Sequence, residues 1–397
     1  MTGKTVRLAQ VVNVKGGKRL PAGASFSSEK TSHPYIRGQD IRDGRIRAND
    51  QYYISEEVFH KISRYTVDEG DVCVTIVGNI GDVGIIPPDL AGANLTENAV
   101  KLLPAVPVLD RRFLAYALLS PDAQQQMKLS AAGAAQPKLG IYKINEIQIP
   151  FPCFHVQKRI ASILSAYDDL IENNTRRIAI LEEMARRIYE EWFVRFRFPG
   201  HEDVEMVESE LGFVPSAWLA MEVKNLVRRL PSGVVYRDSE VQMTGDVPVV
   251  DQSTSEFLGF HNDEPGHMAT VNAPIVIFGD HTCKMQLMVT PFSVGPNTVP
   301  FVTSGLPPHY VYALVRGLVS THDYKRHWSD LIKKRVIVAD EMLALKYSQT
   351  VAPMAAMIEK MRCANRNLRT TRDLLLPKLI SGEIDVSAIP APESIAA

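Results

Sequence analysis

Apolar residues recur in alternating steps of three and four along two long stretches of the chain. In the first stretch these positions hold Ile160, Ile163, Tyr167, Leu170, Asn174, Leu181, Met184 and Ile188. In the second they hold Val351, Met354, Ile358, Met361, Asn365, Leu368 and Leu375. This spacing is the a/d pattern of a coiled coil. It predicts one long helix over 157–194 and another over about 348–380, with Pro353 in its first turn.

Each series contains one Asn at an otherwise apolar step, Asn174 in the first and Asn365 in the second. A lone Asn at an a position sets the register of a coiled coil and lowers its stability. If the two helices run antiparallel, we expect the two amides to meet in one layer. The alternative is that each Asn caps a local bend or faces solvent.

A region of mixed strands and turns precedes each predicted helix. Residues 1–148 alternate Val- and Ile-rich runs with Gly, Asn and Pro, and contain a helical pattern over 112–128. Residues 200–337 repeat this order, with a helical pattern over 310–316. An internal repeat of this length indicates duplication of a domain-plus-spacer unit.

The predicted fold class is therefore α+β, with two similar mixed α/β domains linked by two long helices. The helices form an antiparallel coiled coil, and the repeat is pseudo-twofold. The predicted boundaries are 1–148 for the first domain, 149–196 for the first spacer helix, 197–337 for the second domain, 338–384 for the second spacer helix, and 385–397 for a disordered tail.

Composition narrows the class of protein. The 397 residues have a formal net charge of −1, so bulk charge gives no signal for nucleic acid. The first mixed region has a small excess of basic residues and the second an excess of acidic ones. No apolar run approaches the roughly 20 residues that span a bilayer. The four cysteines lie far apart, which argues against a zinc site. We expect a cytoplasmic protein.

Motifs for catalysis are missing from the sequence. It contains no GxxxxGK[ST], HExxH or GxGxxG, and no Asn/Asp-Pro-Pro-aromatic segment of the kind that amino-methyltransferases use. Asp280 and His281 are adjacent, but no matching nucleophile accompanies them. We therefore predict no catalytic residues and no metal ligands.

The helical regions resemble a known family. The stretches that carry the resemblance are IPFP at 149–152, QKRIASIL at 157–164 with Asp168 and Ile171, LEEMARRIYEEWF at 181–193, RFPGHE at 197–202, FVPSAW at 213–218 and LRTTRDLLLPKLISGEI at 368–384. They are similar to the specificity (S) subunits of Type I restriction-modification systems. The similarity covers the whole chain but is specific in the helices and loose in the mixed regions.

The resemblance implies that each mixed region is a target-recognition domain that reads half of a split double-stranded DNA site. The helices would hold the two domains apart and dock two methyltransferase (M) subunits, with restriction/motor (R) subunits completing the complex. The chain itself would be non-catalytic and hold no cofactor. The complex would use S-adenosylmethionine, ATP and Mg²⁺ on the partner subunits.

DNA contacts require basic, amide or aromatic side chains that reach out from loops. The candidates in the first domain are Lys18, Arg19, Arg45, Arg47, Tyr52, Lys138 and Lys143. Those in the second are Tyr236, Arg237, His281, Lys284, Lys333, Lys334 and Arg335. Lys138, Lys333 and Lys334 are also expected to lie at matching places in the repeat. The alternative for each charged candidate is a solvated surface charge.

The predicted mechanism is geometric. Rods of about 50–60 Å would let the two domains reach major grooves one helical turn, about 34 Å, apart. Two other hypotheses remain open at this point. The chain could be a coiled-coil scaffold whose globular ends bind protein, or the specificity subunit of a complex that only methylates DNA.

Overall fold

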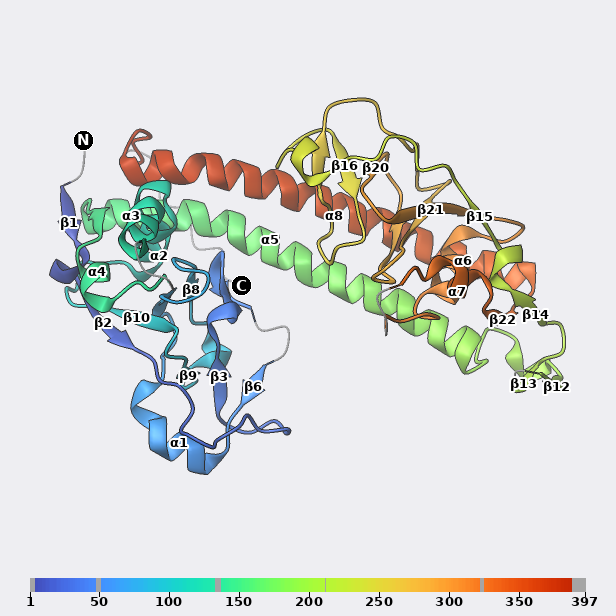
Figure 1. Ribbon diagram of the computed structural model, residues 1–397, viewed down its shortest axis with the longest axis horizontal. Coiled ribbons are helices and arrows are strands. Elements are labelled where there is room, and N and C mark those ends of the chain that lie inside the picture. Colours follow the sequence, from blue (N-terminus) through green and yellow to red (C-terminus); the bar gives the residue numbers. More distant parts are fainter. Residues whose placement is uncertain (1–3, 48–50, 133–136, 211, 322–324, 388–397) are drawn as a thin grey trace. The chain divides into compact units, whose positions relative to one another are not determined.

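The computed structural model describes residues 4–47, 51–132, 137–210, 212–321 and 325–387. Most of the predicted tail, 388–397, therefore lies outside the described residues. The chain forms two compact units, Met1–Ile171 with Arg366–Ala397, and Glu172–Asn365. Each of the two long helices, α5 (Phe154–Tyr189) and α8 (Glu341–Ser381), contributes one part to each unit (Figure 1).

The first unit is built on a six-stranded sheet. Its order is β2 (Val12–Gly16), β10 (Ala99–Pro104), β7 (Val72–Thr75), β8 (Val83–Ile85), β5 (Gly44–Ile46) and β4 (Ile41–Arg42). A smaller sheet has the order β6 (Tyr52–Tyr53), β3 (Pro34–Ile36) and β9 (Asn94–Leu95), and β1 (Thr5–Arg7) pairs with β11 (Gln148–Pro150). Val72 and Val74 of β7 enter one apolar core and Cys73 enters another, because successive side chains leave opposite faces of a strand.

This domain also contains the short α-helices α1 (Glu56–Ile62), α2 (Arg111–Leu119), α3 (Pro121–Ala131) and α4 (Ile141–Asn145). The single helix predicted over 112–128 is thus two helices. Pro121 lacks a backbone N–H and cannot continue α2. The Ser120 hydroxyl accepts a hydrogen bond from the amide of Ala123 and begins α3.

Among its described residues, the second unit contains four sheets. The largest has the order β15 (Val227–Arg229), β21 (Thr298–Thr303), β18 (Ile275–Gly279) and β19 (Met285–Met288). The others are β17 (Gly259–His261), β16 (Val247–Val250) and β20 (Ser293–Val294), then β14 (Leu219–Glu222) with β22 (Arg335–Val338), and β12 (Met206–Ser209) with β13 (Gly212–Pro215). Its short helices are α6 (Pro308–Val315) and α7 (Trp328–Ile332).

The two domains share one strand order. β15-β21-β18-β19 of the second domain corresponds to β2-β10-β7-β8 of the first, and in both all three pairings are antiparallel. The pair β14–β22 likewise corresponds to β1–β11. The predicted fold class, with an internal repeat of mixed domains and long helices, is confirmed.

Both long helices begin earlier than the a/d pattern predicts. α5 begins at Phe154 and continues into a π-helix over Glu190–Val194. α8 begins at Glu341, so Pro353 lies in the helix interior and its predicted place in the first turn is wrong. The added segment is helical because Leu343, Ala344 and Tyr347 pack into the core of the second domain. Asp340 accepts a hydrogen bond from the amide of Leu343 and marks the start.

The buried face of α5 in the first unit is offset from the predicted seam. Leu170, a predicted seam residue, is 52 % exposed, whereas Ile171 is 5 % exposed. Leu164 and Asp168 are also buried. This part of α5 packs into the core of the first domain as well as beside α8, so the domain core, rather than the partner helix alone, selects the buried face.

Asn174 and Asn365 meet within the second unit. The Nδ2 group of Asn174 donates to Oδ1 of Asn365 over 2.9 Å, and Nδ2 of Asn365 donates to the hydroxyl of Thr175 over 3.4 Å. Asn365 is only 3 % exposed. The helices run antiparallel here, since Arg362 also contacts Glu182 further along α5.

A second polar contact joins the helices within the first unit. The Asp168 carboxylate accepts from Nη1 of Arg372 (2.5 Å) and from the hydroxyl of Tyr116 on α2 (2.5 Å). The Asp168 and Arg372 side chains are 12 % and 18 % exposed. Burial and the adjacent carboxylate both raise the pKa of Tyr116, so this hydroxyl remains a donor at all ordinary pH values.

The Asn contact gives the first prediction. Asn174→Leu should lower the free energy of unfolding by about 1–3 kcal/mol, because the buried amide of Asn365 loses a hydrogen bond. The double variant Asn174→Leu/Asn365→Leu should recover that loss, since both positions are then apolar. Thermal unfolding of the full chain measures both. A double variant as unstable as the single one would contradict the explanation.

The Asp168 network gives the second prediction. Arg372→Met should lower the free energy of unfolding by roughly 2–3 kcal/mol, because a largely buried carboxylate loses its cation. Lys378→Met on the same helix is the matched control. Its ion pair with Glu383 is about half exposed and should contribute little. Equal effects of the two substitutions in chemical denaturation would show that the Asp168 pair has no special weight.

Candidate functional site

The loop after β2 holds Lys18 and Arg19, two of the predicted DNA contacts. A Cβ on Gly17 would lie 2.0 Å from the carbonyl oxygen of Thr96, so only glycine fits. This close approach is to the chain's own backbone. The approach fixes the loop, and the amide of Lys18 donates to the carbonyl of Leu95 (2.8 Å). Both basic side chains stay exposed, although Arg19 forms an ion pair with Glu97 (3.2 Å).

Other first-domain candidates already have partners. Arg45 pairs with Asp169 of α5 (3.3 Å) and Arg47 with Asp43 (3.7 Å). Intramolecular pairs of this kind reduce the charge that a side chain can offer to DNA.

Tyr52 lies under the side chain of Arg37, which is not among the DNA contacts predicted from the sequence. The guanidinium of Arg37 is 3.8 Å from the centre of the Tyr52 ring. Asp40 holds that guanidinium through two hydrogen bonds, of 2.7 and 3.1 Å, and these raise the pKa of Arg37. The arrangement fixes one planar cation beside an aromatic ring.

Lys138 and Lys143 differ in their surroundings. Lys143 donates to the carbonyl of Ser130 (2.5 Å) and is half-buried. Lys138 is exposed, and its backbone forms a bridge with Val77. Lys138 is therefore the more available of the two for a ligand.

Several candidates in the second domain also have partners within the chain. Tyr236 stacks on His261 with ring centres 4.0 Å apart, and its hydroxyl donates to Asp263 (3.1 Å). Arg237 begins a 3₁₀ turn, in which its amide donates to Glu240 (2.7 Å). His281 contacts the carbonyl of Lys325 (3.0 Å) through Nδ1.

Lys284 is a structural residue in this arrangement. Its Nζ donates to the carbonyls of Asp251 (3.2 Å) and Ser255 (2.5 Å), and burial lowers its pKa. It ties the β18–β19 turn to the loop after β16. A lysine used in this way has few donors left for DNA.

The last basic cluster follows α7. Lys333 and Lys334 are exposed, and Arg335 forms an ion pair with Glu210. The prediction that these lysines match Lys138 in the repeat is wrong, because Lys138 precedes α4 while they follow α7. No sequence pattern marked α4 or α7, which are five residues long, so only the fold reveals this difference in position.

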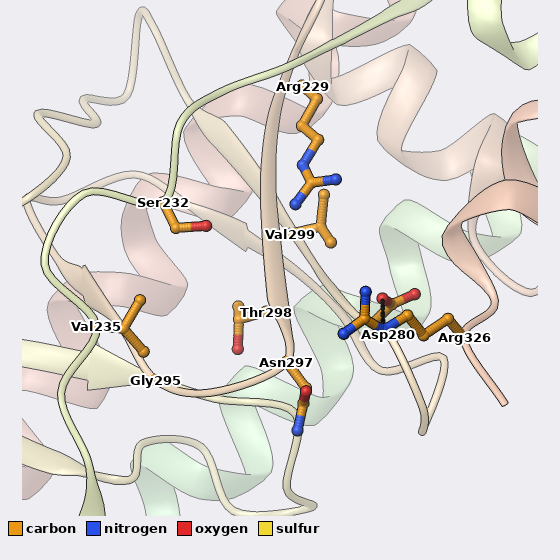
Figure 2. Close-up of a pocket in the computed structure, with 9 residues that line it drawn as sticks. All are labelled: Arg229, Ser232, Val235, Asp280, Gly295, Asn297, Thr298, Val299 and Arg326. Carbon is orange, nitrogen blue, oxygen red and sulfur yellow. Dashed lines mark ion pairs between the residues drawn. The ribbon is translucent and has the colours of Figure 1, made fainter. Parts of the chain in front are cut away.

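A cavity in the second domain includes residues that the candidate list lacks. It has a volume of about 170 Å³ and is lined by Arg229, Ser232, Val235, Asp280, Gly295, Asn297, Thr298, Val299 and Arg326 (Figure 2). Neither Asn297 nor Arg326 is among the DNA contacts predicted from the sequence. Both lie in segments without strong periodicity, so only the fold brings them together.

The comparisons with known proteins find similarity to one family. The family model for the Type I restriction modification DNA specificity domain matches residues 2–183. The MjaIX Type I restriction enzyme specificity subunit of Methanocaldococcus jannaschii is 26 % identical over 410 residues, which cover 93 % of this chain and 92 % of the relative. Both findings make this chain similar to the specificity subunits of Type I restriction-modification systems.

Two further likenesses are consistent with this family. The EcoBI specificity subunit of Escherichia coli is 31 % identical over 140 residues, covering 34 % of this chain and 29 % of that protein. The crystal structure of the Type I system S subunit from M. genitalium matches with a TM-score of 0.60 and 18 % identity, over 95 % of this chain and 96 % of that one. At this identity the structural likeness supports the fold.

The similar proteins are named specificity subunits, which supports the prediction that this chain is a specificity subunit and not itself the enzyme. Among the described helices, none is long and apolar enough to cross a membrane. The described residues also contain no group of three or more His, Cys, Asp or Glu side chains placed to hold a metal ion.

The surroundings of Lys284 give the third prediction. Lys284→Met should destabilise the second domain by about 1–2 kcal/mol, because two carbonyls lose a charged donor. Lys333→Met, at an exposed site, is the control and should leave the melting temperature unchanged. Thermal unfolding monitored by tryptophan fluorescence measures both. An unchanged melting temperature for the Lys284 variant would contradict the structural role and leave Lys284 as a candidate DNA contact.

Proposed function

We propose that this specificity subunit reads a bipartite double-stranded DNA target, one half with each mixed domain. The observation that carries the proposal is the repeated strand order, which gives one chain two similar recognition modules. The first module presents a basic side chain beside an aromatic ring, Arg37 on Tyr52. Phosphate and base contacts need such groups.

The long helices would set the separation of the two half-sites and dock two methyltransferase subunits. Helices of 36 and 41 residues have lengths of about 54 and 62 Å at a rise of 1.5 Å per residue. Exposed apolar side chains, including Ile180 and Met184 on α5 and Met357 on α8, could be covered by such a partner. Restriction subunits would join through the methyltransferases.

The partner subunits would supply the chemistry. S-adenosylmethionine, ATP and Mg²⁺ would bind to them, and the complex would act in the cytoplasm. A complex limited to methylation would use this chain in the same way. The alternative of a protein-binding scaffold is less well supported, because the similar proteins are named specificity subunits.

Methylome sequencing tests the proposed function. Long-read sequencing of the host with and without this gene should reveal a bipartite methylated sequence that depends on the gene. Incubating the purified complex with target DNA and ATP then separates restriction from methylation alone. A methylome that does not change when the gene is removed would refute the proposal.

The role of the helices gives the fourth prediction. Seven residues inserted in helical phase after Ile178, with seven more after Met361 on α8, should lengthen the spacer by about three base pairs. The reason is that two added turns extend a helix by about 10.5 Å, against about 3.4 Å per base pair. Methylated-motif sequencing measures the spacer, and both half-sites should keep their bases.

An insertion of the same length after Ser387, beyond α8, is the control for the added residues. It should leave the spacer as it is in the wild type. If the double-helix insertion methylates the original spacer with normal efficiency, the helices do not set the distance.

A further inference from the structure

The two domains share a polar position just before one of the interior strands of the central sheet. In the first domain the amide of Ile76 donates to the carbonyl of Asn98 (2.8 Å), and in the second the amide of Asp280 donates to that of Asn297 (2.8 Å). Asn98 directly precedes β10 and Asn297 directly precedes β21. Because β10 and β21 occupy the same place in the strand order, the two asparagines are equivalent in the repeat.

A second shared hydrogen bond identifies two equivalent cations. The amide of the residue after Lys138 donates to the carbonyl of Ile76 (3.0 Å), and the amide of the residue after Arg326 donates to that of Asp280 (2.7 Å). Lys138 and Arg326 are both exposed, and each lies just before the short helix α4 or α7. The same backbone pattern thus places one basic residue and one asparagine in each domain.

In the second domain this pair borders the cavity of Figure 2. Arg229 of β15, Arg326 and Asn297 reach the cavity from three different segments. Its volume of about 170 Å³ is several times the roughly 30 Å³ that one water occupies. Within the described residues, no hydrogen bond or ion pair occupies the guanidinium of Arg229. The cavity can therefore take a polar group larger than water.

Asp280 is the carboxylate in the cavity lining, and it lies beside the guanidinium of Arg326. It is 8 % exposed, and its Oδ1 accepts from the amide of Trp328 (2.9 Å). Its Oδ2 lies 3.8 Å from Nε of Arg326, whose side chain is 78 % exposed. With two guanidinium groups against one carboxylate, the site favours an anion.

We propose that this cavity binds a DNA backbone phosphate through Arg229, Arg326 and Asn297, and that Lys138 makes the equivalent phosphate contact in the first domain. The assignment rests on the proposed role of the chain in DNA recognition. Guanidinium and amide groups are common donors to phosphate oxygens, and a concave site with an excess of cations concentrates the field on such a ligand.

A base edge is a poorer ligand for the same cavity. Arginine with aspartate could match the donors and acceptors of a G·C pair in the major groove. That match requires the carboxylate to reach the base, but Asp280 is buried and already bonded to the backbone. The repeat also argues for phosphate, because a position that the backbone fixes identically in both domains suits a contact that every sequence offers.

The test compares two duplexes, one with the methylated target and one with both half-sites scrambled. Binding of each to the complex of full chain and methyltransferase is measured at several salt concentrations. Arg326→Ala, Arg229→Ala and Lys138→Ala should each weaken binding to both duplexes by a similar factor, about tenfold. Each should also reduce the slope of log affinity against log salt by about one, and leave the methylated sequence unchanged.

Two controls keep the result interpretable. Lys224→Ala removes a cation from the same domain, where Lys224 pairs with Glu222 (2.7 Å) away from the cavity lining, and should leave affinity and slope unchanged. Arg326→Lys keeps the charge and should therefore retain most of the wild-type affinity for DNA. If Arg326→Ala weakened binding only through misfolding, keeping the charge would not restore the affinity.

Three outcomes would overturn the assignment. Unchanged affinity and salt slope in the Arg326 and Arg229 variants would exclude a phosphate contact. A methylated motif relaxed at one base would show that the cavity reads sequence instead. A wild-type complex that does not prefer the target duplex would refute the proposed function itself, and with it this proposal.

Discussion

The hydrogen bond between Asn174 and Asn365 constrains the pairing of the two long helices. Each amide has a partner in only one register, because sliding one helix by a heptad would leave Asn365 buried against apolar side chains. An apolar seam alone would tolerate such slippage. The Asp168–Arg372 pair imposes the same kind of constraint within the first unit. Polar contacts that are few and buried therefore fix what the many apolar contacts leave free.

The helices are also part of the domain cores. Ile160 and Leu164 of α5, with Leu379 of α8, belong to the core of the first domain, and Leu343 and Tyr347 of α8 belong to the core of the second. A domain that shares its core with both helices cannot shift along them without exposing apolar surface. The polar contacts that fix the helix register therefore also fix the position of each domain along its part of the helices.

The sequence was sufficient for the features that repeat with a period. It predicted the two helices and, for helices that run antiparallel, the Asn174–Asn365 layer, because residues buried at a regular period recur in every turn. It failed where a tertiary contact decides, as at Leu170, which the domain core turns outward, and at Pro353, which lies inside a longer helix. It failed most for the candidate site. Whether Arg45 or Lys284 is free depends on carboxylates and carbonyls distant in sequence, and no local pattern records them.

The two domains share backbone hydrogen bonds at equivalent positions but differ in the side chains at those positions, and this difference has a functional consequence. The hydrogen bonds that place Asn98 and Asn297 are the same, yet the residue that donates them is Ile76 in one domain and Asp280 in the other. Under the proposed function, the shared backbone would hold both domains on DNA in one orientation, while side chains that differ at equivalent places would read different bases. Two copies of one scaffold can thus recognise an asymmetric site, which a symmetric dimer of a single domain cannot do.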